Sequence, residues 1–391
     1  PNTGKTTFFN AATLANAPVA GYPFTTIDAN IGVTYVRNEC PCRELDSSCN
    51  PKNSRCVKGT RYVPIRTIDV AGLVKGAYEG KGLGNQFLDN LRMASILIHL
   101  IDAAGATNAE GEPVSPGSHD PVDDVEFLEN EIDHWINGIL SEGWSRFARK
   151  SKLEGESMSK AISERLSGLG VNREQVSSAL RTSDLDETSP EKWSEDDIFL
   201  LARSLRKISK PMMLAANKMD VPEAKENFER LLKLDYPVVP MSCEAELILR
   251  RASEKGFIDY QPGEGEFEII NEDKMNEKQK KALNSVRKLL QEWGSTGVQD
   301  AIDKAIYSLL EMIVVYPVDN ENKLTDAKGN VLPDAILVSR GTTAREFAYE
   351  IHSDLGDSFI HAIDARSNRR IGENYKLKNG DIIKIVAAKG R

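Results

Sequence analysis

The first seven residues of the chain are of the types that bind a nucleotide phosphate. They read Pro1-Asn2-Thr3-Gly4-Lys5-Thr6-Thr7, which matches the second half of the pattern G-x-x-x-x-G-K-[ST]. The glycine lets the backbone approach phosphate oxygens, the lysine would reach the β- and γ-phosphates, and the Thr6 hydroxyl would bind Mg²⁺. The residues from Thr6 onward are typical of a helix start, and the N-terminus of a helix favours an anion. Because the chain begins inside this pattern, we expect its first strand and first loop glycine to be missing.

A G-K-T triplet alone is weak evidence, but two further segments fit a phosphate and magnesium site. The motif Asp69-x-x-Gly72 ends a segment with strand character. In a nucleotide switch this Asp holds Mg²⁺ through water, and the Gly N–H contacts the γ-phosphate. Thr25 and Thr26 lie in the loop between the first helix and the second strand, where a threonine would meet Mg²⁺ and the γ-phosphate.

Two later motifs indicate which base is bound. Asn217-Lys218-x-Asp220 follows an apolar segment. The Asp220 carboxylate can accept hydrogen bonds from guanine N1–H and the exocyclic amine, a donor pair that adenine lacks. Ser242-Cys243-Glu244 ends the next strand, where a backbone N–H can contact guanine O6. These motifs, in this order and at strand ends, predict a site for GTP or GDP with Mg²⁺.

The segments that would position these residues alternate between strand and helix. Strand character is found at 32–37, 62–70, 96–101, 211–216 and 237–241, with loops or helices between, which indicates a parallel α/β sheet. Apolar residues recur every three or four positions across 123–210, which predicts packed helices. The predicted nucleotide-binding domain is therefore 1–122 with 211–310, interrupted by a helical insertion at 123–210. A strand-rich unit at 311–391 would form a small separate domain.

Composition restricts the class of protein. The 391 residues are enough for two or three domains, and the net charge of −9 argues against bulk, non-specific binding of nucleic acid. No apolar run approaches the ~20 residues that span a bilayer, and no signal peptide is recognised. We therefore expect a cytoplasmic protein that does not enter the membrane, and we expect a monomer.

The chain resembles GTPases of the Obg superfamily, and most of all the archaeal members of the YchF/Obg-like group. Gly21-Tyr-Pro-Phe-Thr-Thr-Ile27 is similar to the switch I of that family. Asp69-Val-Ala-Gly-Leu-Val-Lys-Gly-Ala77, followed by Gly80-x-Gly82-Leu-Gly84-Asn85-x-Phe87, is similar to its glycine-rich switch II. The resemblance covers nearly the whole chain. It implies a P-loop NTPase with a doubly wound sheet, a coiled-coil-like helical insertion and a C-terminal TGS domain, a β-grasp module associated with RNA and ribosome binding.

The resemblance also implies a function, with alternatives. It implies a slow, Mg²⁺-dependent GTPase that acts as a switch on ribosomes or RNA. Family members with Glu in place of Asp220 prefer ATP, so the Asp in this chain predicts GTP. An ATP-preferring enzyme, or a nucleotide-sensing RNA- or ribosome-binding module with incidental hydrolysis, are the alternatives. Turnover that ribosomes accelerate would favour the switch.

One position departs from the usual catalytic pattern. The residue after Gly72 is Leu73, where Ras-like switches place a Gln that orients the attacking water. Asn2 resembles the potassium ligand of K⁺-activated GTPases, in which a monovalent cation replaces an arginine finger. The alternative is that Asn2 only hydrogen-bonds switch I. The catalytic candidates are then Lys5, Thr26, Gly72 and Asn2.

A cysteine-rich insert at 38–60 interrupts the α/β pattern. Cys40, Cys42, Cys49 and Cys56 are spaced C-x-C-x₆-C-x₆-C. Four thiolates can bind Zn²⁺ tetrahedrally, although a standard finger begins with C-x₂₋₄-C. Two disulfides or free thiols are the alternatives, and any metal here would be structural. The fifth cysteine, Cys243, lies in the base-binding loop, where we expect it to be inert.

The C-terminal unit contains a cluster of basic residues around Tyr375. This composition fits either an RNA-binding surface or an ordinary solvated face, and the family resemblance favours RNA. The residues are Arg366, Arg369, Arg370, Lys376, Lys378, Lys384, Lys389 and Arg391.

Overall fold

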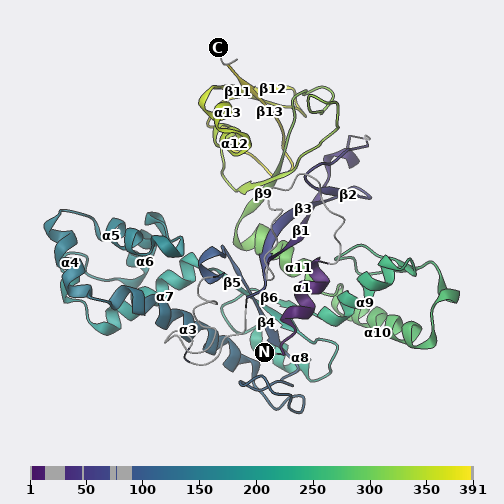
Figure 1. Ribbon diagram of the computed structural model, residues 1–391, viewed down its shortest axis with the longest axis horizontal. Helices are drawn as coiled ribbons and strands as arrows, with labels where there is room; N and C mark the ends of the chain where they lie inside the picture. Colours follow the sequence, from purple (N-terminus) through teal and green to yellow (C-terminus); the bar gives the residue numbers. More distant parts are fainter. Residues whose placement is uncertain (1, 14–30, 46–47, 71–75, 77–89, 389–391) are drawn as a thin grey trace. The chain divides into compact units, whose positions relative to one another are not determined.

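The computed structural model describes residues 2–13, 31–45, 48–70, 76 and 90–388 (Figure 1). The chain divides into two compact units, one of residues 1–11 with 68–301 and the other of residues 12–67 with 302–391. The mixed α/β fold expected from the sequence is confirmed. The predicted domain boundaries stay predictions, because the compact units divide the chain at other points. No helix in the described ranges is both long enough and apolar enough to span a membrane.

A parallel sheet positions the chemistry of the first unit. Its strands lie in the order β4 (Leu97–Asp102), β5 (Met212–Asn217) and β6 (Val238–Pro240), and every residue of β5 is buried. Residue pairs run from Leu97 opposite Met212 to Asp102 opposite Asn217. Parallel strands end at the same edge of a sheet, so this register places Asp102 and Asn217 side by side at the carboxyl edge.

Helices and loops connect these strands. Helix α1 (Lys5–Thr13) begins within the phosphate-loop pattern, α8 (Ala224–Leu231) connects β5 to β6, and α9 (Cys243–Glu254) follows β6. A second hydrophobic core lies beyond β6, in which Leu249 and Tyr260 pack with Leu283 and Leu290. Its elements are α9, β7 (Ile258–Asp259), β8 (Glu268–Ile269) and α10 (Glu277–Trp293), and α11 (Val298–Lys304) follows in the chain.

The crossover from β4 to β5 consists of the predicted helical insertion. Asp120 caps the N-terminus of α3 through the Val122 N–H, and Pro121 is the first helical residue. A buried ion pair joins α3 to α7, with 2.6 Å between Arg206 Nε and Asp133 Oδ1. The helices gather in one group in Figure 1: α3 (Pro121–Ser141), α4 (Trp144–Leu153), α5 (Met158–Arg165), α6 (Arg173–Ser183) and α7 (Glu195–Ser209).

The second unit contains two sheets. One has the order β1 (Ile31–Glu39), β3 (Thr60–Ile68) and β2 (Arg55–Val57), and β2 pairs with β3 antiparallel. The other has the order β10-β9-β13-β11-β12, in which only the β13–β9 pair is parallel among the described pairs. Its strands are β9 (Met312–Pro317), β10 (Ile336–Ser339), β11 (Phe359–Asp364), β12 (Arg369–Ile371) and β13 (Ile382–Ala387).

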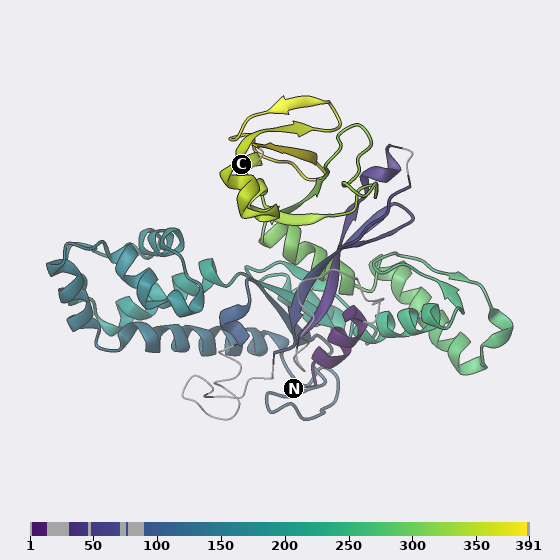
Figure 2. The same cartoon turned by 45° about the horizontal axis from the view of Figure 1, so that its top comes forward.

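Helices α12 (Ala344–Ile351) and α13 (Ser353–Asp357) cover one face of the five-stranded sheet (Figure 2). Thr343 and Glu346 form a capping box at the start of α12, and Phe347 is fully buried against the sheet. Short helical turns complete the description: η1 (Pro41–Arg43), η3 (Ser167–Leu169), η4 (Pro190–Lys192), η5 (Glu272–Lys274) and the π-helical η6 (Ala305–Leu309).

Candidate functional site

The phosphate-loop pattern leads directly into a helix. The Phe8 N–H donates to the Gly4 carbonyl at 2.8 Å, which closes the first turn of α1 and places Lys5, Thr6 and Thr7 in that turn. Lys5 is half-buried and Thr6 is exposed. The free N–H groups and positive dipole end of α1 therefore lie where the sequence pattern predicts phosphate.

Asn217, at the end of β5, connects the base-recognition motif to the phosphate loop. Its Nδ2 donates to the Thr3 carbonyl at 2.8 Å, and its Oδ1 accepts from the Cys243 N–H at 3.0 Å. The side chain is buried, with 4% of the residue exposed. Gly4 has φ +99°, and a Cβ added to it would lie 2.3 Å from Asn217 Nδ2. Both conformation and space therefore require glycine at this position.

Lys218 lies over a buried carboxylate that the sequence reading did not single out. Its Nζ donates to Asp102 Oδ2 at 2.8 Å, and Asp102 is fully buried at the end of β4. The Thr107 hydroxyl donates to the same oxygen at 2.7 Å, and the Ala104 N–H donates to Oδ1 at 3.1 Å. The sequence does contain a pattern that could have identified Asp102. It is an acidic residue that ends an apolar run and immediately precedes Ala103-Ala104-Gly105.

Asp220 is exposed beside the next loop. Its Oδ1 accepts a hydrogen bond from the Ser242 hydroxyl at 2.8 Å, and Ser242 Oγ accepts from the Ala245 N–H at the start of α9. Two motifs separated by more than twenty positions therefore meet at one carboxylate. Burial raises the pKa of the neighbouring Cys243 thiol well above its usual range, which favours the neutral form that we expect to be inert.

Of the remaining residues predicted to bind the nucleotide or Mg²⁺, the structure describes some and not others. Asp69 directly follows β3 and is half-buried. Asn2 is exposed with φ +63°, and its Nδ2 donates to the Gly111 carbonyl at 2.8 Å. Thr26, Gly72 and Leu73 lie outside the described residues, so their roles stay predictions.

The four cysteines of the insert come together although 16 positions separate the first from the last. Their Sγ atoms all lie within 4.8 Å of one another, with 3.9 Å between Cys40 and Cys49 and 3.8 Å between Cys42 and Cys56. A disulfide requires about 2.05 Å, and each of these cysteines is a free thiol. The structure therefore disagrees with the two-disulfide alternative.

Only part of the C-terminal basic cluster is available to a partner. Arg366 pairs with Glu44, and Lys384 Nζ lies 2.7 Å from Glu321 Oε2. Tyr375 packs against the core of the domain. Lys389 and Arg391 lie outside the described residues, which leaves four exposed basic side chains: Arg369, Arg370, Lys376 and Lys378.

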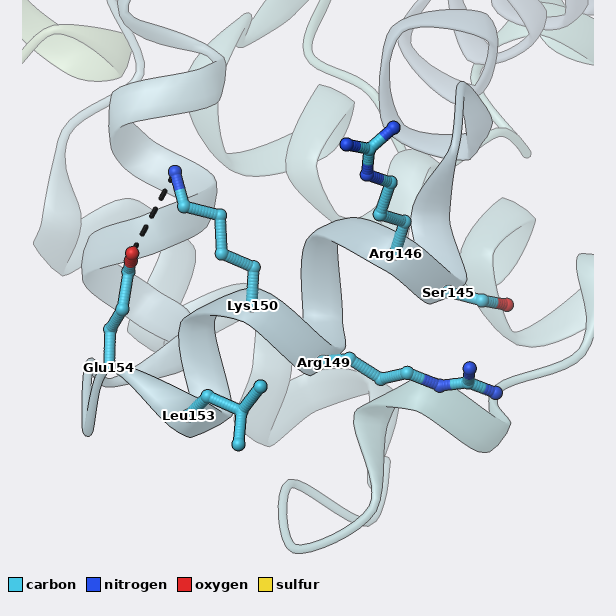
Figure 3. Close-up of a pocket in the computed structure, with 6 residues that line it drawn as sticks. All are labelled: Ser145, Arg146, Arg149, Lys150, Leu153 and Glu154. Atoms are coloured by element: carbon cyan, nitrogen blue, oxygen red, sulfur yellow. Dashed lines mark ion pairs between the residues drawn. The ribbon is translucent and has the colours of Figure 1, made fainter.

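A hollow of about 540 Å³ lies against the outer face of α4 in the helical insertion (Figure 3). Arg146, Arg149 and Lys150 line it together with Leu153, whose exposed fraction is 89%. Lys150 faces Glu154 at 3.8 Å. This basic face belongs to a different part of the first unit from the predicted nucleotide residues.

Comparison with known proteins matches three family profiles along the chain. Residues 1–135 match the 50S ribosome-binding GTPase family, and residues 328–387 match the TGS domain. Residues 215–320 match the Obg-like GTPase YGR210-like, G4 motif-containing domain. These three matches are in the same order as the segments expected from the sequence.

Relatives that match over the whole length, and a solved structure, agree with these family matches. The chain is 52% identical to an uncharacterized GTP-binding protein of Methanocaldococcus jannaschii, over 99% of this chain and 97% of the relative. It is 29% identical to the ribosome-binding ATPase YchF of Bacillus subtilis, over 98% and 96% of the two chains. The crystal structure of a GTP-binding protein from Pyrococcus horikoshii superposes with a TM-score of 0.79 and 42% identity, over 99% of this chain and 98% of that one.

Proposed function

Because the chain belongs to the YchF/Obg-like family of P-loop GTPases, we propose that it prefers GTP to ATP and hydrolyses GTP slowly with Mg²⁺. Its two nucleotide states would alternate as a switch that controls docking on ribosomes. The observation that carries the proposal is the placement of Asp220. Its carboxylate is exposed, the Ser242 hydroxyl fixes one of its oxygens, and the neighbouring Asn217 connects its loop to the phosphate loop.

Base selection follows from the chemistry of that carboxylate. An ionised Asp accepts hydrogen bonds only, and guanine presents two donors on one edge, N1–H and the exocyclic amine. Adenine presents an acceptor at N1, which would face the negative charge of Asp220. The bond from Ser242 orients the carboxylate before a base arrives, so little ordering is needed on binding.

The residues of α1 would hold the phosphates. The ammonium of Lys5 would neutralise negative charge on the β- and γ-phosphates, and the N–H groups of the first turn would donate to their oxygens. Thr6, Thr26 and Asp69 would hold Mg²⁺, which when bound neutralises charge that develops during phosphoryl transfer. Gly72 would donate its N–H to the γ-phosphate. The four-cysteine cluster has no step in this cycle.

Two alternatives remain to be tested. Relatives named ribosome-binding ATPase and Obg-like ATPase, at 29% and 28% identity, favour an ATP-dependent enzyme. The second alternative is a ribosome- or RNA-binding module in which hydrolysis is incidental, and the match of residues 328–387 to the TGS domain favours it. Arg369, Arg370, Lys376 and Lys378 would form the RNA-binding surface in either case, because they are exposed cations, although the Asp381 carboxyl lies near Lys378 and accepts its backbone N–H. We further propose a monomer that acts in the cytoplasm.

The test measures binding and turnover of both nucleotides by the protein, with and without ribosomes. We expect GTP to bind at least about tenfold more tightly than ATP, because ATP lacks the charge-assisted hydrogen bonds to Asp220. We also expect slow GTP turnover that ribosomes accelerate. Equal affinities would favour the ATPase alternative, and ribosome binding that ignores the nucleotide state would favour the binding module.

A further inference from the structure

We propose that Cys40, Cys42, Cys49 and Cys56 form a structural Zn²⁺ site that fastens the cysteine-rich insert to the loop 326–335 of the C-terminal domain. Tetrahedral Zn²⁺ with Zn–S bonds of about 2.3 Å places its sulfur ligands about 3.8 Å apart. The two nearest sulfur pairs lie 3.8 and 3.9 Å apart, and no pair exceeds 4.8 Å. Four thiol sulfurs at these separations surround a space of the size of one ion.

The backbone holds the first two ligands before any metal binds. Cys40 precedes the short helix η1, and Pro41 is the first residue of that helix. The Cys40 N–H donates to the Gly59 carbonyl at 2.9 Å, and the Arg43 N–H donates to the Cys40 carbonyl at 3.0 Å. Cys56 lies in β2, which returns toward the same turn. A preformed site of this kind loses little conformational entropy on binding metal.

A buried cation beside the cluster supplies a second, independent observation. Arg61 is fully buried, and its Nη2 lies 3.4 Å from Cys40 Sγ. Its other partners are neutral: Ser54 Oγ and the Leu332 carbonyl, each at 2.9 Å, and the ring of Tyr316. No carboxylate among the described residues lies within ion-pair distance of it, although its charge acts on the half-buried Asp334 carboxyl nearby and favours the ionised form of that group.

A buried charge without a counter-charge in contact with it is strongly unfavourable. Four thiolates around one Zn²⁺ carry a net charge of about −2, and they would therefore neutralise Arg61. Four protonated thiols would leave this guanidinium with only the more distant Asp334 carboxyl as a counter-charge. A metal-thiolate centre in direct contact with Arg61 therefore compensates its buried charge better than four neutral thiols would.

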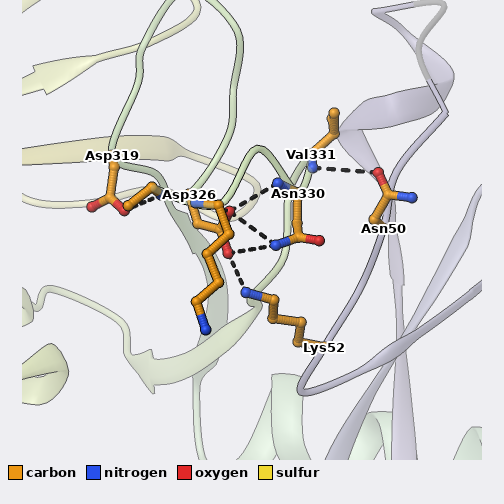
Figure 4. A network of polar contacts seen from close by, with 8 residues as sticks. Asn50, Lys52, Asp319, Asp326, Asn330 and Val331 are labelled. Atoms are coloured by element: carbon orange, nitrogen blue, oxygen red, sulfur yellow. Dashed lines mark hydrogen bonds and ion pairs between the residues drawn. The ribbon is translucent and has the colours of Figure 1, made fainter.

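The segment between the third and fourth cysteines contacts the C-terminal domain through its backbone. The Asn50 N–H donates to the Val331 carbonyl at 2.8 Å, and the Lys52 N–H donates to the Pro333 carbonyl at 2.7 Å. The Lys52 ammonium also pairs with Asp326, which Asn330 holds through two hydrogen bonds from its amide (Figure 4). Since Cys49 and Cys56 flank this segment, a metal bound to both would fix its two ends.

Asn53 completes the connection. Its Nδ2 donates to the Ala335 carbonyl at 3.0 Å, and its Oδ1 accepts from the Ala335 N–H at 2.9 Å. Arg61 reaches the same loop through Leu332. The contacts are polar and short-range, so they depend on the conformation of the insert, and the metal would set that conformation.

The metal content of the purified protein tests the first half of this proposal. We expect about one zinc per chain by elemental analysis, and loss of the zinc from Cys42→Ser and Cys56→Ser. Cys243→Ser is the matched control, because this fifth cysteine is remote from the cluster in sequence and should leave the zinc content unchanged. Absence of zinc, iron in its place, or a disulfide in the wild-type protein would overturn the proposal.

A variant that fails to fold would also lose zinc, so the ligand set needs a second measurement on the wild-type chain. Protein loaded with Co²⁺ should show the intense absorption of a tetrahedral tetrathiolate site. The weak spectrum of an octahedral site would contradict the assignment.

Hydrogen exchange tests the second half. After zinc is removed by a chelator, we expect the amides of Asn50 and Lys52 to exchange faster, because the segment that presents them is released. The amides of α10 should be unchanged and serve as the internal control. Zinc loss without faster exchange at these two amides would show that the metal does not fasten the insert to the loop.

Discussion

The side-chain amide of Asn217 donates a hydrogen bond to the backbone carbonyl of Thr3 at a distance of 2.8 Å. Through its oxygen, the same amide accepts from the Cys243 N–H at 3.0 Å. One buried side chain therefore connects three segments that the sequence marks as separate nucleotide motifs. The end of the site predicted to hold phosphate and the end predicted to hold the base would be positioned together rather than independently.

Substitution of Asn217 should weaken the binding of every nucleotide. Asn217→Ala leaves the Thr3 carbonyl and the Cys243 N–H without their partner, at a cost of roughly 1–3 kcal/mol for each buried group. Because the phosphate loop is displaced, we expect GTP and ATP affinities to fall by similar factors, about tenfold or more. Titration with fluorescent GTP and ATP analogues measures both. A loss confined to GTP would mean that Asn217 acts on the base alone.

Substitution of Asp220 should change which base is bound. In Asp220→Asn, one carboxylate oxygen is replaced by an NH₂ donor, which would face the donors of guanine and match the C2 carbonyl of xanthine. We expect GTP affinity to fall about 100-fold, since hydrogen bonds to a charged group contribute roughly 1.5–3 kcal/mol each, and XTP affinity to rise.

Competition between GTP and XTP for the same protein checks this exchange of specificity. Glu223→Gln is the matched control, because Glu223 is an exposed carboxylate three residues along the chain and should leave both affinities unchanged. If Asp220→Asn kept its preference for GTP, guanine selection would have to come from another group.

Helix α3 of the insertion should influence turnover through one buried carboxylate. Glu131 Oε1 accepts a hydrogen bond from the Gly76 N–H at 2.8 Å, and Gly76 belongs to the run that resembles switch II. We expect Glu131→Met to lower the turnover number for GTP about tenfold, because the Gly76 N–H loses this buried acceptor. GDP affinity should be unchanged.

Single-turnover hydrolysis and GDP titration separate these two effects. Glu126→Gln, an exposed position of the same helix, is the control and should behave as wild type. Equal losses of GDP affinity and turnover would indicate general destabilisation instead of an effect on the switch.

The sequence predicts this site motif by motif, and the contacts between motifs come from the fold. Asn217 and Asp220 are recognisable because their pattern is local. The bond from Asn217 to Thr3 joins positions 214 apart, and the position of Asp102 beneath Lys218 depends on the register of β4 and β5. No periodicity or spacing contains that information, because register is set by the packing of the whole sheet.

The cysteine insert and the basic cluster illustrate the same limit. Spacing leaves zinc, disulfides and free thiols open, and the distances between sulfur atoms decide against disulfides. Composition groups eight basic residues together, but Glu44 and Glu321 neutralise Arg366 and Lys384 from distant parts of the sequence. Charge counts identify a candidate surface, and only tertiary contacts show which of its charges are already paired.

A monovalent cation should accelerate hydrolysis if Asn2 replaces the missing catalytic group. The Nδ2 of Asn2 donates to the Gly111 carbonyl, so its Oδ1 is the atom that would face a cation near the phosphates. We expect GTP turnover to be at least about tenfold faster in K⁺ than in Na⁺, because positive charge there stabilises the charge that develops on the transferred phosphoryl group. Asn2→Ala should remove this difference, and Asn284→Ala, an exposed asparagine of α10, should retain it. Equal wild-type rates in the two salts would restrict Asn2 to holding the loop at Gly111.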